Sequence, residues 1–128
     1  MNFTEALGKE QGEPGKIDKE KGIKEIVEEV FQNRLGEVFS REVIIDLVVR
    51  AYPGTNRTSV IPSDYCYNIV NKGIPFTFHI FEFLGNGMYR CLGSDYPYTG
   101  PIHWKDKQVG EWNSGRHHFW DGTWEKVR

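Results

Sequence analysis

The sequence predicts an α+β fold: a helical first part, a β-hairpin, and a short, aromatic-rich β tail. Two observations carry this prediction. Apolar residues recur at helical spacing through the first half of the chain, whereas from Phe76 onwards they alternate and include many aromatic rings, as they do in strands. The chain has 128 residues and is 38% hydrophobic, which suits one folded domain.

Residues 1–18 are polar and contain glycine, without a sustained period, and we expect them to form a flexible arm. A single globular domain should follow over residues 19–128. We divide that domain into a helical part with a hairpin over residues 19–92 and an aromatic β tail over residues 93–128.

Charge and hydropathy exclude some classes of protein. The net charge is −2, and residues 1–40 carry six basic against nine acidic side chains. No apolar run approaches the ~20 residues that span a bilayer, and the first residues lack the apolar stretch of a signal peptide. We therefore expect a cytoplasmic protein without a membrane partner, in which Cys66 and Cys91 are reduced thiols.

Two helices are predicted from apolar stripes. The first lies in "KEKGIKEIVEEVFQNRLG", where Gly36 ends it and one face carries Ile23, Ile26, Val27, Val30 and Phe31. The second lies in "FSREVIIDLVVRAYPG", between an N-cap at Ser40 and the stop at Pro53-Gly54. Its buried face should hold Val43, Ile44, Leu47, Val48 and Ala51.

A third helix is expected over residues 59–72, in "SVIPSDYCYNIVNK". Pro62 suits a first helical turn, and Ser63 or Asp64 can cap its free amides. The side chains expected to face the core are Tyr65 and Ile69, with Cys66 and Val70. We expect this helix to end at Gly73, because glycine adopts the left-handed backbone conformation easily.

A β-hairpin is predicted in "FTFHIFEFLGNGMYRCLG", because aromatic and β-branched residues flank Gly85-Asn86-Gly87. The apolar phase changes near Ile80–Phe81, which indicates either a bulge or a strand that is covered on both faces. In the tail, "IHWK" and "HHFW" are typical of short strands, joined by turns at "KDKQVG", "WNSG" and "WDG".

Three helices followed by a hairpin is the order of a winged-helix domain, in which the third helix enters the DNA major groove. Two features disagree: the connection before the third helix is long, and Asp64 would face DNA. Side chains suited to bases and phosphates lie on this surface, with one more in the tail. These candidates are Arg57, Ser59, Ser63, Asn68, Asn71, Lys72, Arg90 and Arg116.

The segments "SVIPSDYCYNIVNKG" and "YRCLGSDYPYTG" resemble an uncharacterised bacterial family whose members occur alone or beside HNH-type and other restriction-endonuclease modules. The resemblance covers about residues 40–115. It implies a DNA-facing accessory or sensor role, with a restriction-type nuclease as partner, and it transfers no catalytic residue.

Catalytic and metal chemistry have weaker signals. Cys66 would lie near a helix N-terminus, where a thiolate is stabilised, but no histidine neighbours it in sequence to act as a base. His117 and His118 would point to opposite faces of a strand, so only one of them can join His103, Cys91 or Asp121 in a metal site. No metal, nuclease or phosphate-loop motif is present in the sequence, and we assign no catalytic residue, cofactor or metal ligand.

The aromatic tail is the remaining candidate site. Its rings alternate with basic side chains, an arrangement that suits base stacking or a small-molecule pocket. The alternative is that large rings close the core of a small domain. The candidate pocket residues are Tyr98, Trp104, Trp112, His117 and Trp120.

The function that we expect is a non-enzymatic DNA-binding or DNA-sensing module linked to bacterial restriction or defence. The alternatives are a small-molecule or nucleotide-binding protein that uses the aromatic tail and, third, a metal-dependent hydrolase.

Overall fold

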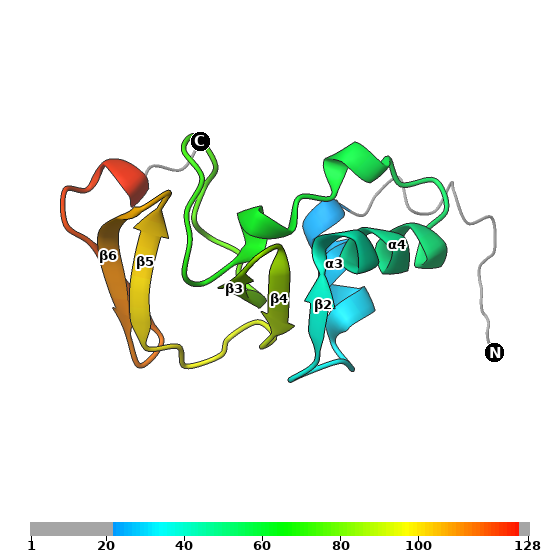
Figure 1. The fold of residues 1–128 in the computed structure, drawn as a ribbon, viewed down its shortest axis with the longest axis horizontal. Coiled ribbons are helices and arrows are strands. Elements are labelled where there is room, and N and C mark those ends of the chain that lie inside the picture. The colour runs from blue at the N-terminus through cyan, green and yellow to red at the C-terminus, as the bar shows by residue number, and fades with distance from the viewer. Residues whose placement is uncertain (1–21, 126–128) are drawn as a thin grey trace.

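The computed structural model describes residues 22–125; the predicted arm and residues 19–21 and 126–128 of the predicted domain lie outside this range. Its two α-helices gather at one end of an elongated molecule, a small sheet occupies the middle, and a second sheet lies at the other end (Figure 1). The fold is therefore α+β, as the sequence predicts. Neither α-helix of the described residues is long and apolar enough to cross a membrane.

Helix α3, Ile23–Phe31, confirms the first predicted stripe. Its buried side chains are Ile26, Val27 and Phe31, while Ile23 and Val30 are half-buried. The helix ends before Gly36, whose positive φ of 86° lets the chain turn into the first sheet.

Helix α4, Arg41–Ala51, begins where expected, because the Ser40 hydroxyl accepts a hydrogen bond of 3.2 Å from the Val43 amide. The buried face is rotated from the prediction. Ile44, Ile45 and Val48 are buried, whereas Val43 is 42% exposed and Ala51 is exposed. Strand β2, Val38–Ser40, precedes this helix and was not predicted.

The predicted third helix is wrong. Residues 59–72 contain no α-helix. Two 3-10 turns, η2 at Arg57–Ser59 and η3 at Pro62–Tyr65, lead into irregular chain with isolated β-bridges at Cys66 and Ile69. Backbone groups at residues 66–70 bond to strands on both sides, and these non-local bonds replace the i to i−4 bonds that a helix would make. The winged-helix recognition helix is consequently missing from this position.

The predicted hairpin is confirmed between β3, Phe81–Gly85, and β4, Met88–Cys91. Asn86 and Gly87 have φ values of 54° and 72°, the two positive values that a tight two-residue hairpin turn needs. The sheet has the order β2-β4-β3 and is antiparallel. Residues 76–80 precede β3 rather than extending it, which accounts for the change of apolar phase.

The second sheet is antiparallel, with the order β5-β6-β7. Strands β5, Gly100–Trp104, and β7, Arg116–Phe119, match the two strands predicted in the tail, and the 3-10 turn η4, Thr123–Glu125, follows them. Strand β6, Lys107–Asn113, covers residues that the sequence indicated as turns. Gly110 is required inside it, since a Cβ there would lie 2.5 Å from the carbonyl oxygen of His118.

Residues 66–70 form a linking segment that joins the two sheets. The Tyr67 amide donates to the carbonyl of Phe81 in the first sheet, at 2.9 Å. The Val70 amide donates to the carbonyl of His103 in the second sheet, and the His103 amide donates to the carbonyl of Asn68, both at 2.9 Å. The "YCYN" sequence thus serves the architecture, as a strand-like bridge.

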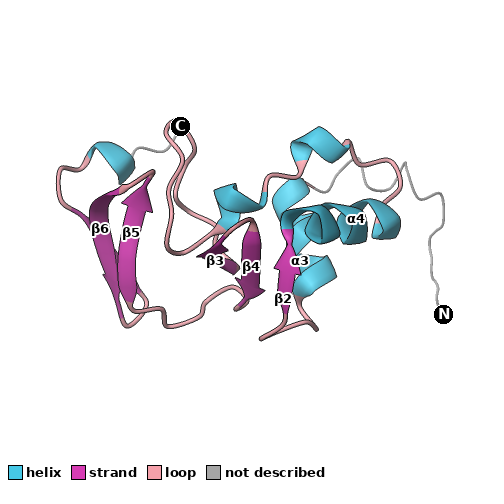
Figure 2. Ribbon diagram, in the orientation of Figure 1, coloured by secondary structure: helices cyan, strands magenta, loops and turns pink. Residues whose placement is uncertain are grey.

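Figure 2 shows the helices beside the first sheet and the second sheet apart from them. Each of these two parts has its own hydrophobic core. The first core lies between the helices and the first sheet, and its buried members include Ile26, Val27, Phe31, Ile44, Val48, Ile80 and Phe81. The second core lies beneath the second sheet, and its buried members are Tyr67, Val70, Phe76, Tyr98, Ile102, Val109, Trp112 and Phe119.

Candidate functional site

Three tryptophan side chains, from the second sheet and the residues that follow it, line one groove at the surface. We call this surface the tryptophan face and define it by Trp104, Trp120 and Trp124, with Lys72, Lys105 and Lys107. It contains a groove of about 200 Å³. The lining residues are Trp104, Lys107, Gln108, Val109, Trp120, Asp121 and Trp124.

The backbone fixes the three rings. Trp104 ends β5, and the Trp120 amide donates to the carbonyl of Val109 on β6 at 3.1 Å. Asp121 then accepts the Thr123 amide at 2.9 Å, which starts the 3-10 turn that carries Trp124. The centroids of the Trp104 and Trp124 rings lie 5.2 Å apart, with the ring planes tilted by 40°.

Lysine ammonium groups lie over these rings. Lys72 Nζ is 5.1 Å from the Trp104 centroid and 5.8 Å from that of Trp124, and Lys105 Nζ is 4.9 Å from Trp104. At an exposed site each such cation–π contact contributes about 0.5–1 kcal/mol. Lys72 reaches the face because the Val70–His103 hydrogen bond holds the end of the linking segment against β5.

The tryptophan face therefore combines flat apolar rings with positive charge. Trp120 is 56% exposed, an unusual fraction for so large an apolar ring. A planar, negatively charged ligand matches both features, since its rings can stack on indole and its anionic groups can pair with ammonium.

The predicted pocket residues fall into two groups. Trp104 and Trp120 lie on the tryptophan face, whereas Tyr98 and Trp112 are buried in the second core. Trp112 Nε1 donates to the carbonyl of Tyr67 at 2.6 Å, and the Tyr98 hydroxyl donates to Glu82 at 3.0 Å. These two side chains are structural.

The adjacent histidines point to opposite sides of β7, as predicted. His117 is half-buried, with its ring centroid 4.9 Å from that of Trp112, while His118 is exposed. His117 thus packs with the second core and takes no part in the tryptophan face. Within residues 22–125, no three His, Cys, Asp or Glu side chains gather closely enough to hold a metal ion.

Two predicted nucleic-acid contacts are engaged in ion pairs within the first part. Arg57 pairs with Asp46 at 2.9 Å and with Glu42 at 3.4 Å. Arg90 lies 3.8 Å from Glu82 across the hairpin. Both arginines carry charge that these carboxylates already balance.

Three more predicted contacts are used inside the fold. The side-chain amide of Asn68 donates to the carbonyl of Phe83 and its oxygen accepts the Phe83 amide, both at 2.8 Å. Asn71 donates to Ser63 at 3.0 Å and to Asp64 at 2.6 Å. These polar groups therefore hold the linking segment in place.

The remaining predicted contacts do not form one surface. Ser59 is exposed in η2, Arg116 is exposed on β7, and Lys72 joins the tryptophan face. Trp124, Lys105 and Lys107 were not among the predicted site residues. The alternation of rings and basic side chains along the tail already indicated these three residues. The position of Lys72 beside them could not be predicted, because it depends on the non-local pairing of the linking segment with β5.

Cys66 lies in an unfavourable setting for a nucleophile. It is buried, its thiol donates to the carbonyl of Pro62 at 3.5 Å, and burial raises the pKa of the thiol well above its ordinary value, with Asp64 adding to the shift. Because the helix expected around it is not formed, the helix N-terminus that would stabilise a thiolate is missing too.

Comparison with known proteins supports an uncharacterised bacterial family. The chain is 39% identical over 99 residues to the uncharacterized protein YnaC of Bacillus subtilis strain 168, a match that spans 73% of this chain and 37% of YnaC. No solved structure shows a significant match. The family model described as a domain of unknown function, DUF7225, matches residues 22–119, and the chain belongs to that family.

Proposed function

We propose that this domain is a non-enzymatic module that binds single-stranded DNA through the tryptophan face. The observation that carries the proposal is the gathering of Trp104, Trp120 and Trp124 beside three lysines on one grooved surface. Stacking of an unpaired base on an aromatic side chain is worth about 1–3 kcal/mol, and lysines supply the phosphate contacts that track a strand.

The arrangement favours unpaired bases over duplex DNA. A duplex reader needs an element that enters a groove, and residues 57–70 hold 3-10 turns and irregular chain where a recognition helix would lie. Flat, exposed rings instead require bases whose faces are accessible.

The first part is winged-helix-like in this proposal and serves as a scaffold. Its order of helix, strand, helix and hairpin, with the sheet order β2-β4-β3, supports that interpretation. The chain spans little more than a third of YnaC, which supports a domain that works beside other modules. A restriction-type nuclease is the partner that we propose, with the module sensing single-stranded DNA for a defence system.

Fluorescence anisotropy with a labelled oligothymidylate tests the proposal. We expect binding at low salt that weakens steeply as salt is raised, because phosphate contacts release counterions. Trp120→Ala should weaken binding by roughly 5- to 150-fold, the equivalent of one lost stacked base. Lys72→Ala should lower both the affinity and the salt dependence.

Arg57→Ala is the matched control, because Arg57 is half-exposed and basic like Lys72 but pairs with Asp46 in the first part. It should bind oligothymidylate like the unchanged protein. If the unchanged protein does not bind oligothymidylate at low salt, the proposal is wrong. If Arg57→Ala and Lys72→Ala lose affinity equally, DNA does not bind specifically at the tryptophan face.

A free nucleotide is the second candidate ligand, favoured by the limited groove volume of about 200 Å³, which suits a single ring system. Competition separates the two. A mononucleotide that displaces the oligomer completely at a similar concentration, with little effect of salt, would identify the nucleotide as the ligand.

A further inference from the structure

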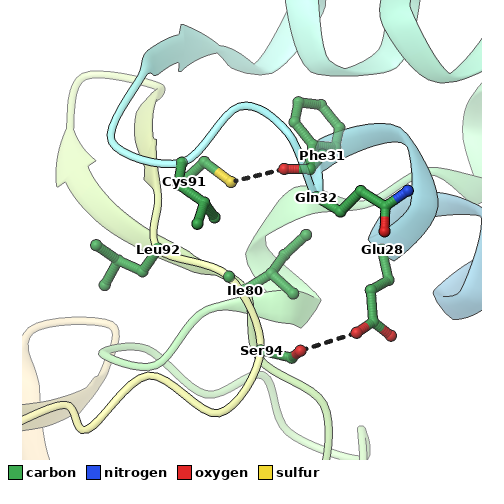
Figure 3. A pocket seen from close by; sticks show the side chains of 9 residues that line it. Glu28, Phe31, Gln32, Ile80, Cys91, Leu92 and Ser94 are labelled. Carbon is green, nitrogen blue, oxygen red and sulfur yellow. Dashed lines mark hydrogen bonds between the residues drawn. The ribbon is translucent and has the colours of Figure 1, made fainter.

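A second pocket lies in the first part of the molecule, apart from the tryptophan face (Figure 3). It has a volume of about 180 Å³ and opens between helix α3 and the loop that follows β4. The lining residues are Glu28, Phe31, Gln32, Leu35, Ile80, Cys91, Leu92, Gly93 and Ser94.

The floor of this pocket is apolar. Phe31, Ile80 and Cys91 belong to the first core and are almost completely buried, and Leu92 and Leu35 form the walls. The Cys91 thiol donates to the carbonyl of Phe31 at 3.5 Å, so its proton is already used in the fold (Figure 3). A floor of this kind suits a small ring or branched chain, since an apolar cavity of about 150 Å³ binds benzene.

The rim carries a fixed carboxylate. The Ser94 hydroxyl donates to Glu28 Oε2 at 2.8 Å, which ties helix α3 to the loop after β4 and holds the carboxylate beside the pocket (Figure 3). A carboxylate accepts more than one hydrogen bond, so Glu28 retains acceptor capacity beyond this contact. Among the described residues that line the pocket, none is a lysine or an arginine.

We propose that this pocket binds a small organic ammonium ion whose apolar ring or chain occupies the floor formed by Phe31, Ile80 and Cys91 and whose charged group pairs with Glu28. The negative charge of Glu28 favours a positively charged ligand, because an ammonium gains a charge-assisted hydrogen bond there whereas a carboxylate is repelled. The apolar floor selects the body of the ligand through buried area.

Methyl NMR of the full chain tests this site, with Leu35, Ile80 and Leu92 as reporters inside the pocket. Benzylamine is the probe, and benzyl alcohol and benzoate are matched compounds with a neutral and a negative group. Benzylamine should shift these methyl signals saturably, benzyl alcohol should bind at least about threefold more weakly, and benzoate should leave the signals unchanged.

Variants assign the two parts of the site. Glu28→Gln should weaken benzylamine binding to the level of benzyl alcohol, and Leu35→Ala should weaken both ligands, since Leu35 is 59% exposed and can be truncated without loss of the fold. Glu111→Gln, an exposed carboxylate on β6, is the control and should bind like the unchanged protein. Unmoved pocket methyls, equal binding of benzoate, or full affinity in Glu28→Gln would each overturn the proposal.

Discussion

The two cores are built from different materials. Among the described residues, five of the fourteen buried members of the first core are aromatic and most of the others are aliphatic. In the second core five of the eight buried members are aromatic, and no α-helix contributes to it. Helices present apolar stripes that interlock, so medium-sized side chains fill the space between them. A three-stranded sheet without a covering helix needs larger side chains, and here rings take the place of the missing layer.

The second core also depends on polar groups at its rings. Tyr67 illustrates this: its hydroxyl donates to the carbonyl of Gly93 at 2.7 Å and accepts the Tyr96 amide at 3.0 Å, while its ring stacks on Tyr98 with centroids 5.2 Å apart. Trp112 adds its hydrogen bond to the carbonyl of Tyr67. Burial of these donors and acceptors is tolerated because each has a partner.

Trp112→Ala should break the second core and produce the largest effect. Loss of the ring and of its hydrogen bond should lower the free energy of unfolding by about 3–5 kcal/mol. Urea unfolding should be followed by tryptophan fluorescence, which reports the tail, and by far-UV circular dichroism, which reports α3 and α4. The two curves should coincide, because the linking segment bonds to both sheets.

Trp120→Ala is the control for that experiment, since its ring is 56% exposed and its loss should cost no more than about 1 kcal/mol. Unfolding of the tail at lower urea than the helices in Trp112→Ala would show instead that the two cores are independent units.

The second largest effect should come from acid, which should lower the stability of the second core. Burial among the aromatic rings lowers the pKa of His79 from 6.5 to about 4, and His117 adds to the shift while a hydrogen bond to the carbonyl of Cys66 opposes it. The folded state thus binds this proton less tightly than the unfolded state. The stabilisation is complete above pH 6.5 and is lost as the pH falls towards 4, by on the order of 2–3 kcal/mol.

Chemical denaturation between pH 7 and pH 4 measures this dependence. His79→Phe should flatten the profile in that window, whereas His118→Gln, a change at an exposed histidine on β7, should keep the profile of the unchanged protein. An identical acid loss in His79→Phe would assign the dependence to other groups.

The correct predictions in the first part concern structure that is determined by residues close together in the sequence. The stripe of α3, the Ser40 cap and the Asn86-Gly87 turn are each determined by residues within a few positions of one another. The opposite orientation of His117 and His118 followed in the same way from strand geometry.

The predictions that were wrong concern structure that depends on contacts between segments far apart in the sequence. Tyr65 and Ile69 have helical spacing, yet the residues between them are not helical. The Tyr67 amide bonds to β3 and the Asn68 carbonyl bonds to β5 instead. Strand β6 was not predicted, because Gly110 is typical of a turn. The structure explains this glycine, since the β7 backbone lies too close to it to leave room for a Cβ. The candidate site followed the same pattern: the rings of the tail were visible, but Lys72 reaches them through the linking segment.

Asn68→Ala should have the smallest of these effects and is the sharpest test of the linking segment. The side chain pairs with both backbone groups of Phe83 at 2.8 Å, as a neighbouring strand would. Its removal leaves a partly buried amide and carbonyl without these partners, at a cost of about 2 kcal/mol. Hydrogen exchange should accelerate at the Phe83 amide by roughly 30-fold, the equivalent of that free energy.

Asn113→Ala provides the matched control, because Asn113 is exposed at the end of β6 and its truncation should change stability by less than about 0.5 kcal/mol. The fluorescence and circular dichroism curves of Asn68→Ala should still coincide, since the Tyr67–Phe81 and Val70–His103 backbone bonds remain. Separation of the curves would make this one side chain the main coupling between the two cores. An unchanged exchange rate at Phe83, with stability altered by less than 0.5 kcal/mol, would mean that the backbone bonds alone join them.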